Sequence, residues 1–209
     1  KKKMTRIDMA IHTKHYPKIK KKFNLVGKRK FLHIGYDLDA KNTNYLSEIA
    51  KKYGSKKFST IGDLNLSGIK SYGKRNLSLK KNLKIIRNYD FLIMTSKYDA
   101  NPTVILEAMS WGLIPICTPT CGYINKKEII NIPLNNIKQT LRVLKKLDFI
   151  DKKELLKFQE RNLYTVKKKY NWNNFANNVS KILKSNGKSY LYDERYYFVR
   201  DTKNSFYLL

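Results

Sequence analysis

Short apolar runs alternate with helical patterns through the middle of the chain, and this alternation constrains the fold more than any other feature. Four runs have the length and composition of buried strands, and a fifth is weaker: residues 31–35, 58–61, 91–94 and 113–117, with 69–72 as the weaker run. Helical patterns lie between them, over residues 43–53, 78–88 and 102–111. Strands that are apolar on both faces need helices on both faces, as in a parallel sheet. We therefore predict a doubly wound α/β domain.

The rest of the chain divides by pattern, and no internal repeat is visible. Beyond residue 135 the pattern is helical only, and the last helix carries an apolar stripe from Trp172 to Leu183. The first residues are rich in lysine with little periodicity, whereas the last are rich in tyrosine with no clear period. We therefore predict a basic linker segment over 1–29, a domain over 30–185 that ends in a helical C-terminal extension, and a tyrosine-rich tail over 186–209.

The charge balance is strongly basic. The 209 residues include 44 Lys and Arg against 16 Asp and Glu, so the net charge is 44 − 16 = +28. Such a balance favours anionic partners. The excess, however, is mostly lysine spread over every segment, whereas sequence-reading nucleic-acid sites depend on arginine and interleaved aromatic residues. Solvated helix faces are therefore the favoured explanation, a loose contact with an anionic membrane stays open, and we expect no specific nucleic-acid partner.

Composition also limits the compartment and the chemistry. No run approaches the roughly 18 consecutive apolar residues of a membrane span. No apolar run follows Lys1–Lys3, as a signal peptide would require, and two cysteines suit a reducing compartment. We therefore expect a cytoplasmic protein, with a peripheral contact at the inner face of the membrane left open. Cys117 and Cys121 have no second pair after them, and His12 and His15 have no clustered carboxylates, so we expect no metal site.

The helix predicted over 102–111 is marked at both ends. Asn101 is a favoured N-cap, Pro102 fits the first helical position, and Gly112 fits the residue just past the end. The helix follows the strand over 91–94, so its N-terminus lies at the carboxyl edge of the sheet, where open α/β sheets bind ligands. The free amides at the start of the helix then offer a partial positive charge to an anion, most naturally a phosphate.

Two acidic residues accompany this helix. Asp99 lies in the loop before it and Glu107 within it, with seven residues between them. Carboxylates that can grip neighbouring hydroxyls beside a phosphate-binding helix suit a sugar or a ribose. Acidic residues near a helix start are also placed for the helix dipole alone, and the spacing does not distinguish the two explanations.

The run Asp99–Gly112 resembles the donor-site signature of family 4 glycosyltransferases: an acid, seven residues, then Glu-Ala-Met, a small residue, one further residue and Gly. These are retaining enzymes built from two facing Rossmann-like domains. The resemblance implies that this chain is the C-terminal, donor-binding half. It implies that Asp99 contacts the transferred sugar and that Glu107 contacts the nucleotide ribose. The residues that would present backbone groups to the sugar and the diphosphate are Asn101, Thr103 and Val104.

A second match lies after the first predicted strand, where the family has Gly-Arg and then Lys-Gly. Gly35 and Lys41 match at the right spacing, Tyr36 stands in place of the arginine, and Asn42 stands in place of the second glycine. The resemblance implies that Gly35 and Tyr36 border the diphosphate and that Lys41 neutralises it. The missing arginine removes a bidentate phosphate clamp. From the residues alone, Lys41 is also explained as solvated surface.

The resemblance implies a hexosyltransferase-type enzyme of polysaccharide biosynthesis. Such an enzyme binds a nucleotide sugar and transfers the glycosyl group, with retention, to a glycan or lipid-linked acceptor. Lys41 and Asp99 would be its catalytic residues, no metal or other cofactor would be required, and the chain would be inactive without an N-terminal half. Two alternatives stay open: a non-catalytic sugar-nucleotide-binding module and an isomerase similar to the sugar-nucleotide 2-epimerases.

Overall fold

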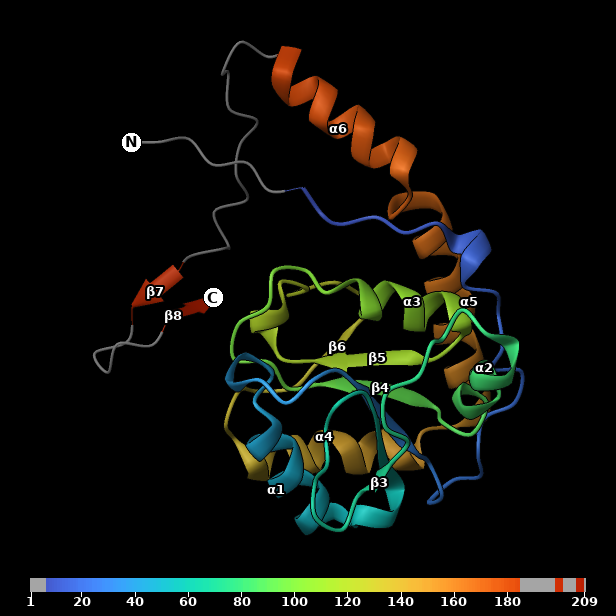
Figure 1. Ribbon diagram of the computed structural model, residues 1–209, viewed down its shortest axis with the longest axis vertical. Helices are drawn as coiled ribbons and strands as arrows, with labels where there is room; N and C mark the ends of the chain where they lie inside the picture. The colour runs from blue at the N-terminus through green and yellow to red at the C-terminus, as the bar shows by residue number, and fades with distance from the viewer. Residues whose placement is uncertain (1–6, 185–197, 201–205, 209) are drawn as a thin grey trace.

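The computed structural model describes residues 7–184, 198–200 and 206–208 (Figure 1). Its centre is a six-stranded sheet with the order β3-β2-β1-β4-β5-β6, in which every neighbouring pair is parallel. The strands are β1 (Phe31–Ile34), β2 (Phe58–Ile61), β3 (Lys70–Ser71), β4 (Phe91–Met94), β5 (Ile114–Cys117) and β6 (Ile130–Asn131). The strand order reverses between β1 and β4, which confirms the predicted doubly wound, Rossmann-like α/β fold.

Helices cover both faces of this sheet. They are α1 (Thr43–Tyr53), α2 (Lys80–Ile86), α3 (Thr103–Trp111), α4 (Ile137–Phe149) and α5 (Lys152–Lys169), and a further helix, α6 (Trp172–Lys184), follows α5. Helices α1 and α4 lie on one face, whereas α3 and α5 lie on the other (Figure 1). Each face has its own core, because successive strand residues point to opposite sides: Phe31 packs toward α1 and α4, and Leu32 toward α2 and α3.

The predicted elements are confirmed to within a few residues, with two differences. The sixth strand, β6, was not predicted, because two residues are too short for a periodic pattern to indicate a strand. Helix α6 carries the predicted apolar stripe, yet none of its residues is buried among the described parts of the chain, and Figure 1 shows the helix projecting away from the sheet. None of the described helices has the length and apolar composition that crossing a bilayer requires.

The predicted tail, residues 186–209, lies almost entirely outside the described residues. Two short strands of it, β7 (Phe198–Arg200) and β8 (Phe206–Leu208), pair with each other in antiparallel register. The predicted domain limits at residues 30 and 185 stay predictions.

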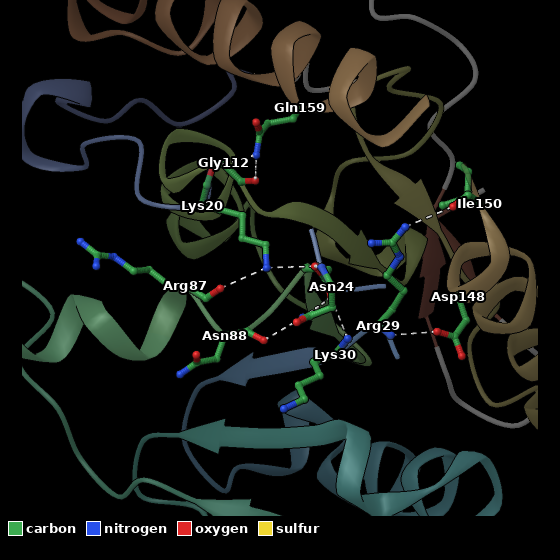
Figure 2. Close-up of polar contacts among 11 residues, drawn as sticks. Lys20, Asn24, Arg29, Lys30, Arg87, Asn88, Gly112, Asp148, Ile150 and Gln159 are labelled. Carbon is green, nitrogen blue, oxygen red and sulfur yellow. Dashed lines mark hydrogen bonds and ion pairs between the residues drawn. The ribbon is translucent and has the colours of Figure 1, made fainter. Parts of the chain in front are cut away.

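The described part of the predicted linker, residues 7–29, packs against the domain. Ile11, Ile19 and Phe23 are buried, as is Lys20, which is 1% exposed. The Lys20 ammonium forms an ion pair with Asp90, at 2.9 Å from Oδ1, and donates to the carbonyl of Arg87 at 3.1 Å. Figure 2 shows Lys20 reaching toward the polar groups at the amino edge of the sheet, with its backbone held by Gln159 of α5 at 3.1 Å.

Asp90 joins this segment to the sheet. Its Oδ1 accepts from the amide of Asn24 at 2.8 Å, and its Oδ2 accepts from the Asn24 side chain at 2.7 Å and from the Lys30 amide at 2.9 Å. Figure 2 shows Asn24 and the backbone amide of Lys30 within this cluster, whereas the Lys30 side chain extends away from it. The carboxylate is fully buried, so these hydrogen bonds and the Lys20 ion pair together offset the cost of removing its charge from water.

Asp90→Ala should therefore be strongly destabilising. It leaves the Lys20 ammonium buried without its counter-ion, and we expect the free energy of unfolding to fall by about 3–5 kcal/mol in urea denaturation. Burial already lowers the pKa of Lys20 and Asp90 opposes this, so the variant favours the neutral amine and the deficit should shrink as the pH rises.

Glu48→Ala is the matched control. Its ion pair with Lys52 on α1 is about half exposed on both sides, so its loss should cost less than about 1 kcal/mol. Equal losses for the two variants would contradict the role assigned to the buried pair.

Candidate functional site

Two loops meet at the carboxyl edge of the sheet, one after β1 and one after β4. The Lys97 amide donates to the Ala40 carbonyl at 2.8 Å, and the Thr95 hydroxyl donates to the carbonyls of Lys41 and Asn42 at 3.1 and 3.2 Å. These contacts follow from the pairing of β1 with β4, because parallel neighbours end at the same edge. The loops carry the residues that the sequence singles out.

Lys41 and Asp99 form an ion pair across the two loops. The Lys41 side chain is 21% exposed and that of Asp99 is 15% exposed, so both are reachable from solvent yet partly shielded. Asp99 is fixed further by its amide, which donates to the Thr120 carbonyl at 3.1 Å, and by the Ser96 hydroxyl at 3.5 Å from Oδ2. The structure thus brings together the two residues that the sequence analysis names as catalytic.

Asn42 takes a backbone conformation that glycine usually adopts. Its φ of 52° and ψ of 49° place it in the left-handed region, where Asn is better tolerated than most other non-glycine residues. Its side-chain amide donates to Asn135 at 2.9 Å, and the residue is buried. Asn42 therefore provides the left-handed turn that directly follows Lys41.

The start of α3 differs from the prediction at two residues. Pro102 is the N-cap and Thr103 the first helical residue, so the predictions that Asn101 caps the helix and that Pro102 takes its first position are both wrong. Asn101 has a φ of 66°, and its side chain accepts from the Met9 amide at 3.1 Å and donates to Asp8 at 3.0 Å. The N-terminal segment thus occupies the side chain that would have capped the helix.

As a result, the first backbone N–H groups of α3 have no capping side chain. Thr103 and Val104 are partly exposed, and no residue in the described part of the chain accepts a hydrogen bond from either amide. The end of α3 agrees with the prediction. Gly112, just past the last helical residue, is left-handed at φ 88°, and its amide donates to the carbonyls of Ala108 and Met109. The open helix start therefore lies at the same edge as Lys41 and Asp99.

Glu107 lies one turn further along α3, in a different environment. Burial raises the pKa of its carboxyl group, and hydrogen bonds from the Thr103 and Tyr16 side chains oppose this rise. Glu107 shares no hydrogen-bond partner with Asp99 among the described residues. Asp99 in the loop and Glu107 in the helix therefore have separate hydrogen-bond partners.

Gly35 and Tyr36 follow β1. The Gly35 amide donates to the Ile61 carbonyl at 3.0 Å, and its own carbonyl lies where a side chain on Gly62 would stand. Tyr36 is 52% exposed, and its ring has the Lys74 ammonium 5.9 Å from its centroid. Sequence reasoning missed Lys74, because only the fold brings the loop after β3 to the loop after β1.

Of the groups set aside in the sequence analysis, Cys117 and Cys121 are buried, whereas His12 and His15 are exposed. Cys117 and Cys121 are free thiols inside the core, and His33 is 1% exposed with its Nδ1 3.0 Å from the Ile93 carbonyl. Burial lowers the pKa of His33 to about 4, so the ring is neutral at physiological pH. In the described part of the chain, no three His, Cys, Asp or Glu side chains group as metal ligands would.

Comparison with known proteins relates the fold to structures of enzymes. No family model and no curated protein matches the chain. Sucrose-phosphate synthase from Thermosynechococcus elongatus has a TM-score of 0.65, at 12% identity over 85% of this chain. HepE from Anabaena, solved in complex with UDP and glucose, has a TM-score of 0.62, at 10% identity over 84%. A glycosyltransferase from Rickettsia africae has a TM-score of 0.60, at 15% identity over 75%.

These identities establish a shared fold. The chain spans 51%, 55% and 48% of the lengths of these three structures, which is about half. The comparison therefore matches the Rossmann-like α/β domain to one part of larger proteins.

The close approach of Gly62 to Gly35 is testable. A Cβ on Gly62 would lie 1.8 Å from the Gly35 carbonyl oxygen, and Gly62 has a φ of 131°. Gly54 has a similar φ of 121°, but a Cβ on Gly54 would have no atom within 4 Å, so this position isolates the backbone strain from the clash. We expect Gly62→Ala to lower the free energy of unfolding by about 1–3 kcal/mol more than Gly54→Ala in urea denaturation. Equal losses would show that the two loops separate easily.

Proposed function

We propose that this chain is the nucleotide-sugar-binding half of a retaining glycosyltransferase similar to family 4. The observation that carries the proposal is the meeting of Lys41 and Asp99 beside the open N-terminus of α3, at the carboxyl edge of the sheet. This edge is where open α/β sheets bind ligands, and a helix start favours a phosphate. The shared fold with HepE, whose structure contains UDP and glucose, supports the choice of ligand.

The roles follow from the charge of each group. The Lys41 ammonium and the amides of Thr103 and Val104 would stabilise the diphosphate as the glycosidic bond breaks, because preorganised positive charge at a leaving group lowers the barrier. Asp99 would orient the sugar hydroxyls, and Glu107 would hold the ribose hydroxyls. We propose that the reaction needs no metal, since these groups supply the positive charge themselves.

The Lys41–Asp99 ion pair would couple binding of the diphosphate to binding of the sugar. A diphosphate that approaches Lys41 competes with Asp99 for the ammonium, which leaves the Asp99 oxygens available to sugar hydroxyls. The Lys74 ammonium lies 5.9 Å from the ring centroid of Tyr36, the residue that stands in place of the family's arginine. We propose that Lys74 contributes positive charge there without the fixed fork geometry of a guanidinium.

Transfer is proposed for a longer protein. The chain spans about half of each of the three structures compared above, so the acceptor site, for a glycan or a lipid-linked acceptor, would belong to an additional N-terminal half. We expect the 209-residue chain to bind the donor weakly and to transfer nothing by itself. A cytoplasmic location with a peripheral contact to anionic membrane is part of the same proposal.

A non-catalytic donor-binding module is the second candidate. Tyr36 favours it, because an exposed tyrosine replaces the arginine that would clamp the diphosphate. Nucleotide-sugar binding without turnover by the longer protein would select this candidate.

Calorimetric titration with UDP, GDP, UDP-glucose and GDP-mannose tests donor binding. We expect binding of at least one of them, with no change on addition of EDTA. Lys41→Ala should weaken it about tenfold, because one charge-assisted contact to the diphosphate is lost. Glu107→Gln should weaken it to a similar degree, about tenfold, because the amide is a poorer acceptor for the ribose hydroxyls.

Lys56→Ala is the matched control. Lys56 is an exposed lysine near the opposite edge of the sheet, and its removal should leave the affinity unchanged. The proposal fails if none of the four ligands binds, or if Lys56→Ala weakens binding as much as Lys41→Ala, since the charge would then act nonspecifically.

A further inference from the structure

A tight turn before β1 projects two aliphatic side chains at the amino edge of the sheet. The Lys28 amide donates to the Leu25 carbonyl at 2.9 Å, and Gly27, at the third position of the turn, has a φ of 76° that suits glycine. Leu25 is 72% exposed and Val26 is 49% exposed. The turn therefore holds in solvent two side chains of a type that is usually buried.

The base of the turn is fixed on both sides. Before it, the amide and the side chain of Asn24 donate to Asp90 at 2.8 and 2.7 Å. After it, the Arg29 amide donates to the Asp148 carboxylate at 2.9 Å, as drawn in Figure 2. Because both ends are attached to buried carboxylates, the exposed side chains are presented by a rigid turn.

The end of α4 lies beside this turn. The Gly27 amide donates to the Asp148 carbonyl at 3.0 Å, and Phe149, the last residue of α4, is 61% exposed. The Lys57 ammonium pairs with the buried Asp148 carboxylate and donates to the Gly27 carbonyl at 2.7 Å, so Asp148 adds no unpaired negative charge. Three exposed apolar residues are thus neighbours in the fold, and we call them the apolar tip: Leu25, Val26 and Phe149.

Positive charge surrounds the apolar tip. Residues 21–30 contain no Asp or Glu, and four of their lysines are exposed: Lys21, Lys22, Lys28 and Lys30. The start of α5 adds two exposed lysines and two exposed carboxylates, which balance: Lys152, Lys153, Asp151 and Glu154. The surface around the tip therefore combines exposed apolar side chains with a net excess of ammonium groups.

We infer that this surface binds an anionic lipid bilayer. The apolar tip would enter the boundary between headgroups and acyl chains, while the flanking ammonium groups contact the lipid phosphates. The inference deepens the membrane contact of the proposed function by locating it, and it does not require the donor site. Binding through the amino edge would leave Lys41 and Asp99, at the opposite edge, open to solvent.

The kind of side chain favours a bilayer over a nucleic acid. Nucleic-acid sites depend on arginine forks and on aromatic rings that stack with bases. The one arginine of residues 21–30 is Arg29, which is 1% exposed, and the turn itself presents Leu25 and Val26. Exposed ammonium groups around aliphatic side chains instead match a surface of phosphates above hydrocarbon.

Cosedimentation of the 209-residue chain with vesicles tests the inference. We expect binding to vesicles of phosphatidylcholine and phosphatidylserine, and little binding to phosphatidylcholine alone. Leu25→Ser should weaken binding about tenfold, because the transfer of one leucine side chain out of water is lost. Leu79→Ser is the matched control: Leu79 is also exposed, at 45%, but lies at the start of α2, and its loss should leave binding unchanged.

The contribution of charge is tested by two triple variants that remove the same number of lysines. Each lysine near an anionic bilayer contributes about fivefold in affinity, so alanine at the three tip positions should weaken binding about a hundredfold. Those positions are Lys21, Lys22 and Lys28. Alanine at three exposed lysines of α2 should weaken binding less than about threefold. Those control positions are Lys80, Lys81 and Lys84.

Insertion is measured with a polarity-sensitive fluorophore on the thiol of Val26→Cys. The native thiols, Cys117 and Cys121, are buried, so the label reacts at the introduced position. We expect its emission to shift to the blue with anionic vesicles, whereas the same label on Leu79→Cys should show no shift.

Three results would overturn the inference. They are unchanged vesicle binding by Leu25→Ser, equal losses for the two triple variants, and displacement of the vesicles by duplex DNA at moderate salt with no blue shift at position 26. Calorimetry with UDP and GDP separates this inference from the proposed function. Vesicle binding without nucleotide binding would leave the inference standing and remove the proposed function, whereas the reverse result would remove only the inference.

Discussion

Three phenylalanines stack across β2, β1 and β4. The parallel pairing of these strands determines where the loops of the site meet. The Phe31 ring of β1 lies between the rings of Phe58 and Phe91, at 4.9 and 5.2 Å with nearly parallel planes. These three residues are also direct partners in the strand register, Phe31 with Phe58 and with Phe91. A shift of β1 by one residue would turn its apolar side chains to the wrong faces, so this packing sets where the loops after β1 and β4 end.

The two edges of the sheet are stabilised differently. At the amino edge, the buried Lys20 and Asp90 hold the N-terminal segment in place, and most polar groups there have partners inside the protein. At the carboxyl edge, Lys41 and Asp99 are partly exposed, and the first amides of α3 are open. Charge that is already neutralised favours a fixed structure, whereas partly exposed charge and open donors favour a ligand. This contrast is the physical basis for locating the function at the carboxyl edge.

Much of the site was predictable from local pattern. Lys41 was singled out by the resemblance, through its spacing after a strand that ends at Gly35, whereas Asp99 and Glu107 were placed by a helix marked by Pro102 and Gly112. The Asn101 prediction was wrong because a cap preference is local, and the Met9 amide and Asp8, both distant in sequence, occupy that side chain. Lys74 was missed for the same reason, since it reaches Tyr36 from a segment with no periodic pattern of its own.

The sequence by itself determined the alternation of strands and helices and the glycine-marked ends of α1 and α3, because these depend on periodicity and on backbone preferences of single residues. Only the tertiary structure decided which groups meet. Lys41 and Asp99 are 58 positions apart, and they pair because β1 and β4 are neighbours at the point where the strand order reverses. The N-terminal segment follows α3 because Met9 contacts Asn101 at one end and the buried Lys20–Asp90 ion pair holds the other. Contacts of this kind depend on the order of strands and the path of a segment, which no local pattern specifies.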